Sequence, residues 1–343
     1  MGTLAFWVAL FMFGALVIYV LTGGADFGGG IVALLARGPR REAIRELVFH
    51  ALAPIWEANH VWLIVAIVLL FVAFPKVFAA VTTALHIPLT LMLIGIVLRG
   101  AAFVFAQYDE ETSRARYWWQ RVFMWSSLLT PVTFGVVVGA VASGRIRVEP
   151  QTGLVQVGFV EGWWALFPFL VGGFAATLFA YLASVYLLLE TEDVGIREWL
   201  RKLALGLGVA LGVGAWVTLW WAQHETLTVY DRLVHSPLAQ PFHLVTGVAA
   251  LLALLALWRR RYTLARISAA TQAVAIMTGW GLAQYPALLV PDMTIANSAA
   301  PDTVLRPLLI ALILGSVVLI PSFGYLYWVF KQHTLAVRQR APQ

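Results

Sequence analysis

Residues 54–74 read PIWEANHVWLIVAIVLLFVAF, so a Glu, an Asn and a His stand at the beginning of a run that is otherwise apolar. Together with its flanks, this run is long enough for a helix that crosses a membrane. A carboxylate inside a bilayer is costly, so Glu57 has to be neutral, paired or functional. Residues elsewhere in the chain must therefore account for Glu57.

The composition of the whole chain indicates a polytopic membrane protein. Of 343 residues, 61% are hydrophobic and only 12% are charged. We interpret the first apolar segment, which no basic stretch precedes, as a membrane span and not a removable signal peptide. The chain has no Cys, which excludes disulfides, thiolate-bound clusters and covalently attached haem. The net charge of +6 does not indicate nucleic-acid binding, because the basic residues stand between apolar runs.

The apolar segments predict an all-α fold. We expect nine transmembrane helices, at approximately 4–36, 50–75, 77–106, 117–143, 163–190, 200–223, 239–258, 264–290 and 305–330. They form one membrane-embedded domain, 1–343, with a four-helix bundle in 1–143, a second in 163–290 and a peripheral helix at 305–330. The Gly-rich stretch GGADFGGG, residues 23–30, is expected to bend the first helix or to allow close helix contact.

The distribution of basic residues predicts the orientation. With nine spans, one side of the membrane collects Arg37, Arg40, Arg41, Arg45, Arg114, Arg116, Arg197, Arg201, Lys202, Arg259, Arg260, Arg261, Lys331, Arg338 and Arg340. The other side holds Lys76, Arg145, Arg147, Arg232 and Arg306. Cytoplasmic loops carry the excess of Lys and Arg, so the N-terminus is expected to be periplasmic and the C-terminus cytoplasmic.

Three charged residues, Asp26, Glu57 and Arg99, are predicted to lie well inside spans. At about 1.5 Å per residue they stand at similar depth in the cytoplasmic half, and His60 shares the Glu57 face at the i, i+3 spacing. We expect one buried cluster of two carboxylates and one guanidinium. One carboxyl of such a cluster would tend to hold a proton, so a structural ion-pair cluster and a proton-carrying site both fit.

No cofactor or metal site is predicted on this chain. The histidines have no recognisable spacing of haem or metal ligands, and several fall at helix ends or in loops. They are His50, His60, His86, His224, His235, His243 and His333. GGADFGGG lacks the Lys-Ser/Thr of a phosphate-binding loop, which argues against a nucleotide site.

Four stretches resemble subunit II of the cytochrome bd-type quinol oxidases: GGADFGGGI (23–31), PIWEANHVWL (54–63), IVLRGAAFVF (96–105) and the block that begins GWGLAQYPALLVPDM at Gly279. The resemblance runs in order over nearly the whole chain. It implies a heterodimer in which subunit I carries haems b and d and the quinol site, while subunit II carries none of them. Such an enzyme oxidises quinol, reduces oxygen to water and takes protons from the cytoplasm.

The same resemblance implies roles for single residues. Asp26 and Glu57 match acids associated with a proton path toward the haems, Arg99 matches an Arg-Gly pair, and Trp62 matches a Trp linked to an oxygen route. Asn59 and His60 are expected to extend the hydrogen-bonded path toward the partner.

Several positions depart from the family pattern. The family commonly has acids where Gly23 and Val104 stand, Asp at 57, Gly in place of Ala58, and Gln or Glu in place of His60. Because of these differences, the family pattern does not define the proton route in this chain. They also indicate a divergent branch of the family, with the cyanide-insensitive type as one option.

The resemblance also implies a setting and partners. These are the cytoplasmic membrane of a bacterium or archaeon, subunit I, a small single-span accessory subunit, quinol and lipid. Two alternatives remain open: a polytopic secondary transporter, which would carry midplane charges in inverted repeats, and a structural or assembly subunit of another respiratory complex.

Overall fold

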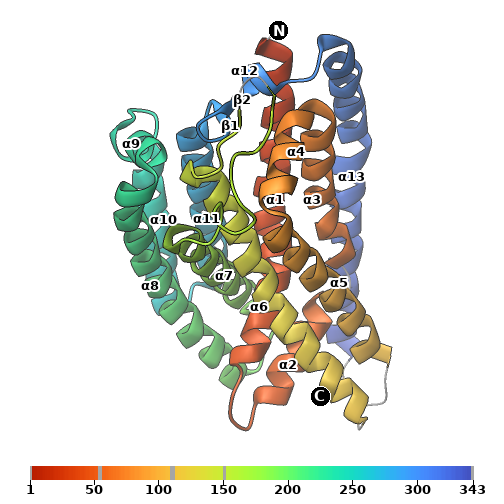
Figure 1. Cartoon of the computed structure of the whole chain (residues 1–343). Helices are drawn as coiled ribbons and strands as arrows, with labels where there is room; N and C mark the ends of the chain where they lie inside the picture. Colours follow the sequence, from red (N-terminus) through yellow and green to blue (C-terminus); the bar gives the residue numbers. More distant parts are fainter. Residues whose placement is uncertain (1, 53–55, 109–112, 150–151, 341–343) are drawn as a thin grey trace.

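The computed structural model describes residues 2–52, 56–108, 113–149 and 152–340, and this part of the chain is mostly helical (Figure 1). The helices are α1 (Gly2–Leu35), α2 (Arg41–Leu52), α3 (Trp56–Ala73), α4 (Pro75–Ala84), α5 (His86–Tyr108), α6 (Arg114–Ser143), α7 (Leu166–Leu187), α8 (Val194–Glu225), α9 (Leu227–His235), α10 (Gln240–Trp258), α11 (Tyr262–Gln284), α12 (Ile295–Ser298) and α13 (Asp302–Arg340). Strands β1 (Ala287–Leu289) and β2 (Met293–Thr294) form an antiparallel hairpin.

Eight helices in the described residues are long and apolar enough to cross a membrane: α1, α3, α5, α6, α7, α8, α10 and α13. Each overlaps one of the nine predicted segments. The remaining segment, 264–290, overlaps α11, which has 23 residues but no stretch apolar enough to be counted with the eight. The chain is therefore a multi-pass membrane protein, and the ninth span stays a prediction.

Three predicted spans are divided or end early in the structure. The segment 50–75 is divided between α2 and α3, and residues 53–55 lie outside the described part. The segment 77–106 is divided between α4 and α5, and the candidate span begins at His86. The segment 264–290 runs past the end of α11 at Gln284 into β1. Hydropathy missed these breaks because α4 and β1 are themselves apolar.

The connections alternate between two ends of the molecule, and the termini lie at opposite ends (Figure 1). At the end that holds α2, the guanidinium of Arg40 lies against Gly195 at the start of α8, and Arg260 pairs with Glu198 at 3.4 Å. The regions predicted to be rich in basic residues therefore gather at one end. Which end faces the cytoplasm stays a prediction.

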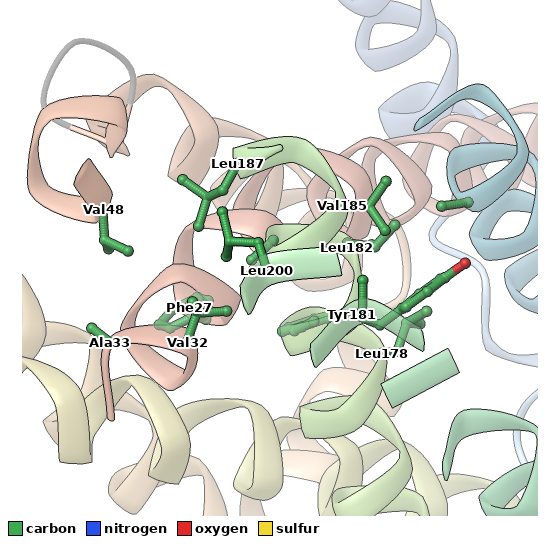
Figure 2. Close-up of a cluster of buried hydrophobic side chains, with 14 of the residues drawn as sticks. Phe27, Val32, Ala33, Val48, Leu178, Tyr181, Leu182, Val185, Leu187 and Leu200 are labelled. Carbon is green, nitrogen blue, oxygen red and sulfur yellow. The ribbon is translucent and has the colours of Figure 1, made fainter. Parts of the chain in front are cut away.

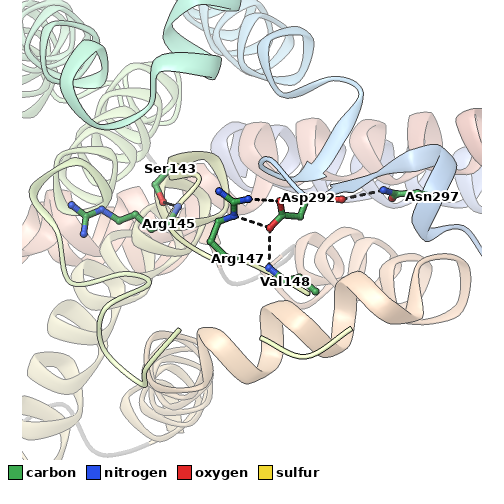
Figure 3. Close-up of polar contacts among 6 residues, drawn as sticks. All are labelled: Ser143, Arg145, Arg147, Val148, Asp292 and Asn297. Carbon is green, nitrogen blue, oxygen red and sulfur yellow. Dashed lines mark hydrogen bonds and ion pairs between the residues drawn. The ribbon is translucent and has the colours of Figure 1, made fainter. Parts of the chain in front are cut away.

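The opposite end is held by Asp292, which follows β1 (Figure 3). Its carboxylate accepts hydrogen bonds from Arg147 Nε and Nη2 at 2.9 and 3.0 Å and from the backbone N–H of Val148 at 2.9 Å. Asn297 donates to the Asp292 carbonyl at 3.0 Å. This network ties the segment after α6 to the hairpin, 145 residues further along the chain.

Helices α1 and α7 pack closely at the glycines of α1. A Cβ at Gly28 would lie 1.8 Å from the backbone oxygen of Phe179, and one at Gly24 would lie 2.9 Å from its ring. Only glycine permits this approach. The Gly-rich stretch was predicted either to bend the first helix or to allow close helix contact. Because α1 runs as one element from Gly2 to Leu35, close contact is the role that the geometry requires.

The largest buried cluster surrounds this contact. Phe27 and Val32 of α1, Val48 of α2, Leu182 of α7 and Leu200 of α8 belong to it (Figure 2). Helix α2 contributes because Ile44, Val48 and Leu52 recur at the i, i+4 spacing and bury one face. The cluster fixes α1 in the centre of the fold and holds Asp26 there.

Candidate functional site

Asp26 and Asn59 form the centre of the candidate site. Asp26 on α1 and Asn59 on α3 are each 1% exposed, and Asn59 Nδ2 donates a hydrogen bond to Asp26 Oδ2 at 2.7 Å. Gly24 and Gly28 bring α1 against α7 on the other side of Asp26. A carboxyl group is thus held deep in the protein by an amide that can donate to it in either protonation state.

Arg99 on α5 is the second buried charged group, also 1% exposed. Its guanidinium carbon lies 4.6 Å from the centre of the Phe27 ring and 5.3 Å from that of Phe123, distances at which aromatic rings attract a cation. Within the described residues no ion pair closer than 4 Å links Arg99 to Asp26 or Glu57, and its Nε and Nη2 make no hydrogen bond. Arg99 and Asp26 therefore attract each other across the site without touching.

His60 stands beside Arg99. Its Nε2 lies 3.5 Å from Arg99 Nη1, and its ring centre is 5.5 Å from that of Phe27 and 6.0 Å from that of Tyr19. The side chain is half-buried. His60 thus lies between the buried site and the surface of α3.

Glu57 does not join the buried cluster that its spacing predicts. It stands in the first turn of α3, where a negative charge is favoured by the helix dipole, and its side chain is exposed. The expectation of two buried carboxylates around Arg99 is wrong because Glu57 lies on a different face of α3 from Asn59, which points inward. Ile64 and Phe71, seven and fourteen residues after Glu57, share its face and are 58% and 57% exposed.

The other predicted positions lie around this site. Trp62 is half-buried, and its ring centre is 5.3 Å from that of Phe323 on α13. Val104 is 39% exposed. Gly23 faces Tyr19, because a Cβ at 23 would lie 2.6 Å from Tyr19 Cε2. The ring of Tyr19 thus fills the space that a side chain at position 23 would take.

Sequence reasoning missed the aromatic residues that line the site. Tyr19, Phe27 and Phe123 are each at most 2% exposed. Tyr19 and Gly23 are four residues apart, the spacing at which helix side chains meet, so this pair had a signal in the sequence. Phe123 is distant in sequence and had none.

The described residues contain no group of three or more His, Asp or Glu side chains arranged to hold a metal ion. The site brings together a carboxyl and an imidazole, which are able to gain and lose protons, and an amide and a guanidinium, which donate hydrogen bonds.

Comparison with known proteins gives the family. A family model described as cytochrome bd terminal oxidase subunit II matches residues 4–330. A Bacillus subtilis protein assigned as a cytochrome bd menaquinol oxidase subunit II is 22% identical over 96% of each chain. Cytochrome bd-I ubiquinol oxidase subunit 2 of Escherichia coli is 31% identical over 129 residues, and this match spans 38% of the present chain and 33% of the relative.

Superposition on a solved structure shows which known fold the chain resembles. A chain in the structure of bd oxidase from Geobacillus thermodenitrificans superposes with a TM-score of 0.81 at 21% identity, over 96% of this chain and 98% of that one. The resemblance predicted from the motifs is confirmed. Because the family model covers nearly the whole sequence, the chain belongs to the cytochrome bd terminal oxidase subunit II family.

Proposed function

We propose that the chain is the haem-free subunit II of a cytochrome bd-type terminal oxidase, in the cytoplasmic membrane of a bacterium or archaeon. Its partner, subunit I, carries haems b and d, oxidises quinol and reduces oxygen to water. This chain supports that reaction by covering the partner and by carrying protons toward it from the cytoplasm. A small accessory subunit and lipid complete the assembly.

The buried Asp26–Asn59 pair is the observation that carries the proposed proton path. A carboxyl that is 1% exposed in a membrane helix is expensive to keep ionised, and an isolated structural role would be better served by an apolar residue. Arg99 offsets the charge of the ionised form without a direct bond, so Asp26 is able to gain and lose a proton without a large rearrangement. These are the properties of a proton carrier.

Glu57 provides the exit of the path. It lies on an exposed face of α3 that is otherwise apolar, with Ile64, Val68 and Phe71. A carboxylate on such a face requires a partner within the membrane, and subunit I supplies one in this proposal. Protons pass from Asp26 past Asn59 and His60 to Glu57 and on to the haem-bearing chain.

Trp62 is proposed to line the oxygen route. It is half-buried between α3 and α13, on the helix that also carries Glu57. Oxygen is apolar and partitions into the membrane, so an aromatic, water-poor passage suits it.

The first test is purification of the tagged protein from its own membranes in mild detergent, followed by a reduced-minus-oxidised spectrum. The proposal expects a partner with b- and d-type haem bands and no haem on this chain. A colourless protein that purifies alone would contradict the oxidase assignment and favour the transporter.

Glu57→Gln tests the exit of the path. The amide keeps the shape of the side chain but cannot carry a proton, so quinol-dependent oxygen consumption per haem d is expected to fall while the complex still assembles. Glu161→Gln, at an exposed position in the segment between α6 and α7, is the matched control. Wild-type turnover in assembled Glu57→Gln would refute this role, and loss of the complex would favour a structural ion pair across the interface.

A further inference from the structure

A cavity of about 400 Å³ lies beside Asp26 and extends between α1, α3, α7 and α11, with α2 at its edge. Its polar lining consists of Thr22, Asp26, Asn59, Tyr186, Glu190 and Arg266. Asp26 and Asn59 are each 1% exposed, whereas Glu190 is exposed and Arg266 is half-buried. The cavity therefore connects the buried carboxyl of the candidate site with the surface.

The mouth of the cavity lies at the end of the molecule that collects basic residues. Glu190 follows the last residue of α7, Leu187, and precedes the start of α8. Gly28 of α1 is level with Ala183 of α7, since a Cβ at Gly28 would lie 2.8 Å from the Ala183 Cβ. Glu190 is seven residues beyond Ala183, which corresponds to roughly 10 Å along the helix direction.

Over this separation, proton transfer from Glu190 to Asp26 is expected to run through water, because proton donors and acceptors must approach within a hydrogen bond or be joined by water. The cavity has room for on the order of ten water molecules, and its polar lining offers them partners. A hydrogen-bonded chain of water is therefore able to connect the two carboxyl groups.

We propose that this cavity is the entrance of the proton path, with Glu190 as the group that takes protons from the aqueous phase and Arg266 as a positioning residue at the mouth. This inference rests on the proposed function of Asp26. A proton moves from bulk water to the Glu190 carboxylate, then along water to the Asp26 carboxylate. Only O–H bonds form and break, and no electron is transferred.

Arg266 is held at the wall of the cavity by an aromatic side chain of α7. Its guanidinium carbon lies 4.9 Å from the centre of the Tyr186 ring, which fixes the cation against α7 and keeps it on the wall of the cavity. Its guanidinium N–H groups are donors that water in the cavity is able to accept from. Tyr186 and Thr22 supply hydroxyl groups along the wall.

The absence of Cys in this chain allows a test that does not depend on activity. Thr22→Cys in the assembled complex gives the chain one thiol on the cavity wall, and modification by a small methanethiosulfonate reagent is followed by mass spectrometry of this chain. Ala270→Phe is designed to fill the cavity, and Thr271→Phe, on the adjacent exposed position, is its matched control.

The proposal expects the thiol of Thr22→Cys to be modified, with a rate that falls about tenfold or more when Ala270→Phe is added and stays unchanged with Thr271→Phe. Only the first added side chain blocks the route of water and reagent. The proposal that the cavity is an entrance would be overturned if the reagent does not modify the thiol of Thr22→Cys, or if it modifies the thiol equally fast when Ala270→Phe is added. If Thr22→Cys does not assemble, the same comparison is made with Ala25→Cys, which lines the same wall.

The second test measures proton uptake when the fully reduced complex reacts with oxygen, followed with a pH-sensitive dye. Glu190→Gln and Ala270→Phe are expected to slow uptake about tenfold with haem content and haem reduction unchanged, a split that a merely structural defect would not give. Glu192→Gln, exposed in the same connection but outside the cavity, is the control.

Comparison with Asp26→Asn separates the two levels of the proposal. If Asp26→Asn slows uptake while Glu190→Gln and Ala270→Phe do not, the entrance lies elsewhere and the role of Asp26 stands. If none of the three slows uptake, both the entrance and the path through Asp26 are refuted. If a lipid headgroup occupies the mouth instead, the thiol of Thr22→Cys stays inert in lipid vesicles that contain the complex, which also overturns the proposal.

Discussion

Gly28→Ala is expected to separate α1 from α7 and to disturb the site that depends on their contact. The new Cβ would lie 1.8 Å from the backbone oxygen of Phe179, whereas a carbon and a carbonyl oxygen require about 3.3 Å. The helices must therefore move apart by roughly 1.5 Å, at a cost typical of overpacking, about 1–3 kcal/mol. Better helix propensity of Ala returns at most about 1 kcal/mol.

The same movement affects Asp26, two residues away. A displacement of roughly 1.5 Å would shift Asp26 relative to Asn59 and disrupt the 2.7 Å hydrogen bond between them, because such bonds keep to about 2.7–3.2 Å. Gly28→Ala should therefore lower turnover as well as stability.

The assay is heat unfolding of the purified complex, followed by tryptophan fluorescence, together with oxygen consumption per haem. Gly14→Ala on the same helix is the matched control, because a Cβ there would meet nothing within 4 Å. We expect the unfolding temperature to fall by several degrees for Gly28→Ala and not for Gly14→Ala. Equal stability and turnover of the two variants would refute the packing argument.

Two further substitutions test the surroundings of the site. Asp292→Asn removes the charge that Arg147 binds with two hydrogen bonds, and because Arg147 is partly exposed the expected loss in unfolding free energy is about 1 kcal/mol. Asp231→Asn, in an exposed ion pair, is the control and should leave the unfolding free energy unchanged. Equal effects of the two substitutions would contradict a stabilising role of the Arg147–Asp292 pair. Gly23→Asp should fail to assemble because the new side chain meets the Tyr19 ring, whereas the double variant Gly23→Asp with Tyr19→Ala should assemble. The yield of heterodimer purified from membranes measures both. Assembly of Gly23→Asp alone would contradict the argument that the Tyr19 ring occupies the space of a side chain at position 23.

The membrane-crossing helices could be predicted from the sequence because length and hydropathy determine them. The short helices could not be predicted from hydropathy alone. Helix α2 had a signal that was not used, the spacing of Ile44, Val48 and Leu52, which is typical of a surface helix with one buried face. Helix α9, which lies between two predicted spans, and the hairpin after α11 depend on contacts made only in the folded chain, such as the hydrogen bond from Arg232 to the Tyr285 carbonyl.

The candidate site was predicted in part. Depth counting brought Asp26, Glu57 and Arg99 to one level, with His60 on the Glu57 helix. In the structure Asn59 bonds to Asp26 and His60 lies beside Arg99, whereas Glu57 is exposed. Depth counting could not determine which way Glu57 points, because the face of a helix that turns inward depends on its neighbours, and Asn59, two residues later, takes the inward position. The division into two four-helix bundles and the orientation in the membrane stay predictions.

Asp26→Asn in the assembled complex tests the central claim most directly. Asn is close in shape and still accepts the hydrogen bond from Asn59, so assembly and haem content should match those of Asp231→Asn, which changes an exposed carboxylate outside the site. The measurement is proton uptake during a single reaction of the reduced complex with oxygen. The account predicts that Asp26→Asn slows uptake about tenfold or more while oxygen still binds. Uptake at the rate of Asp231→Asn would contradict a proton path through Asp26.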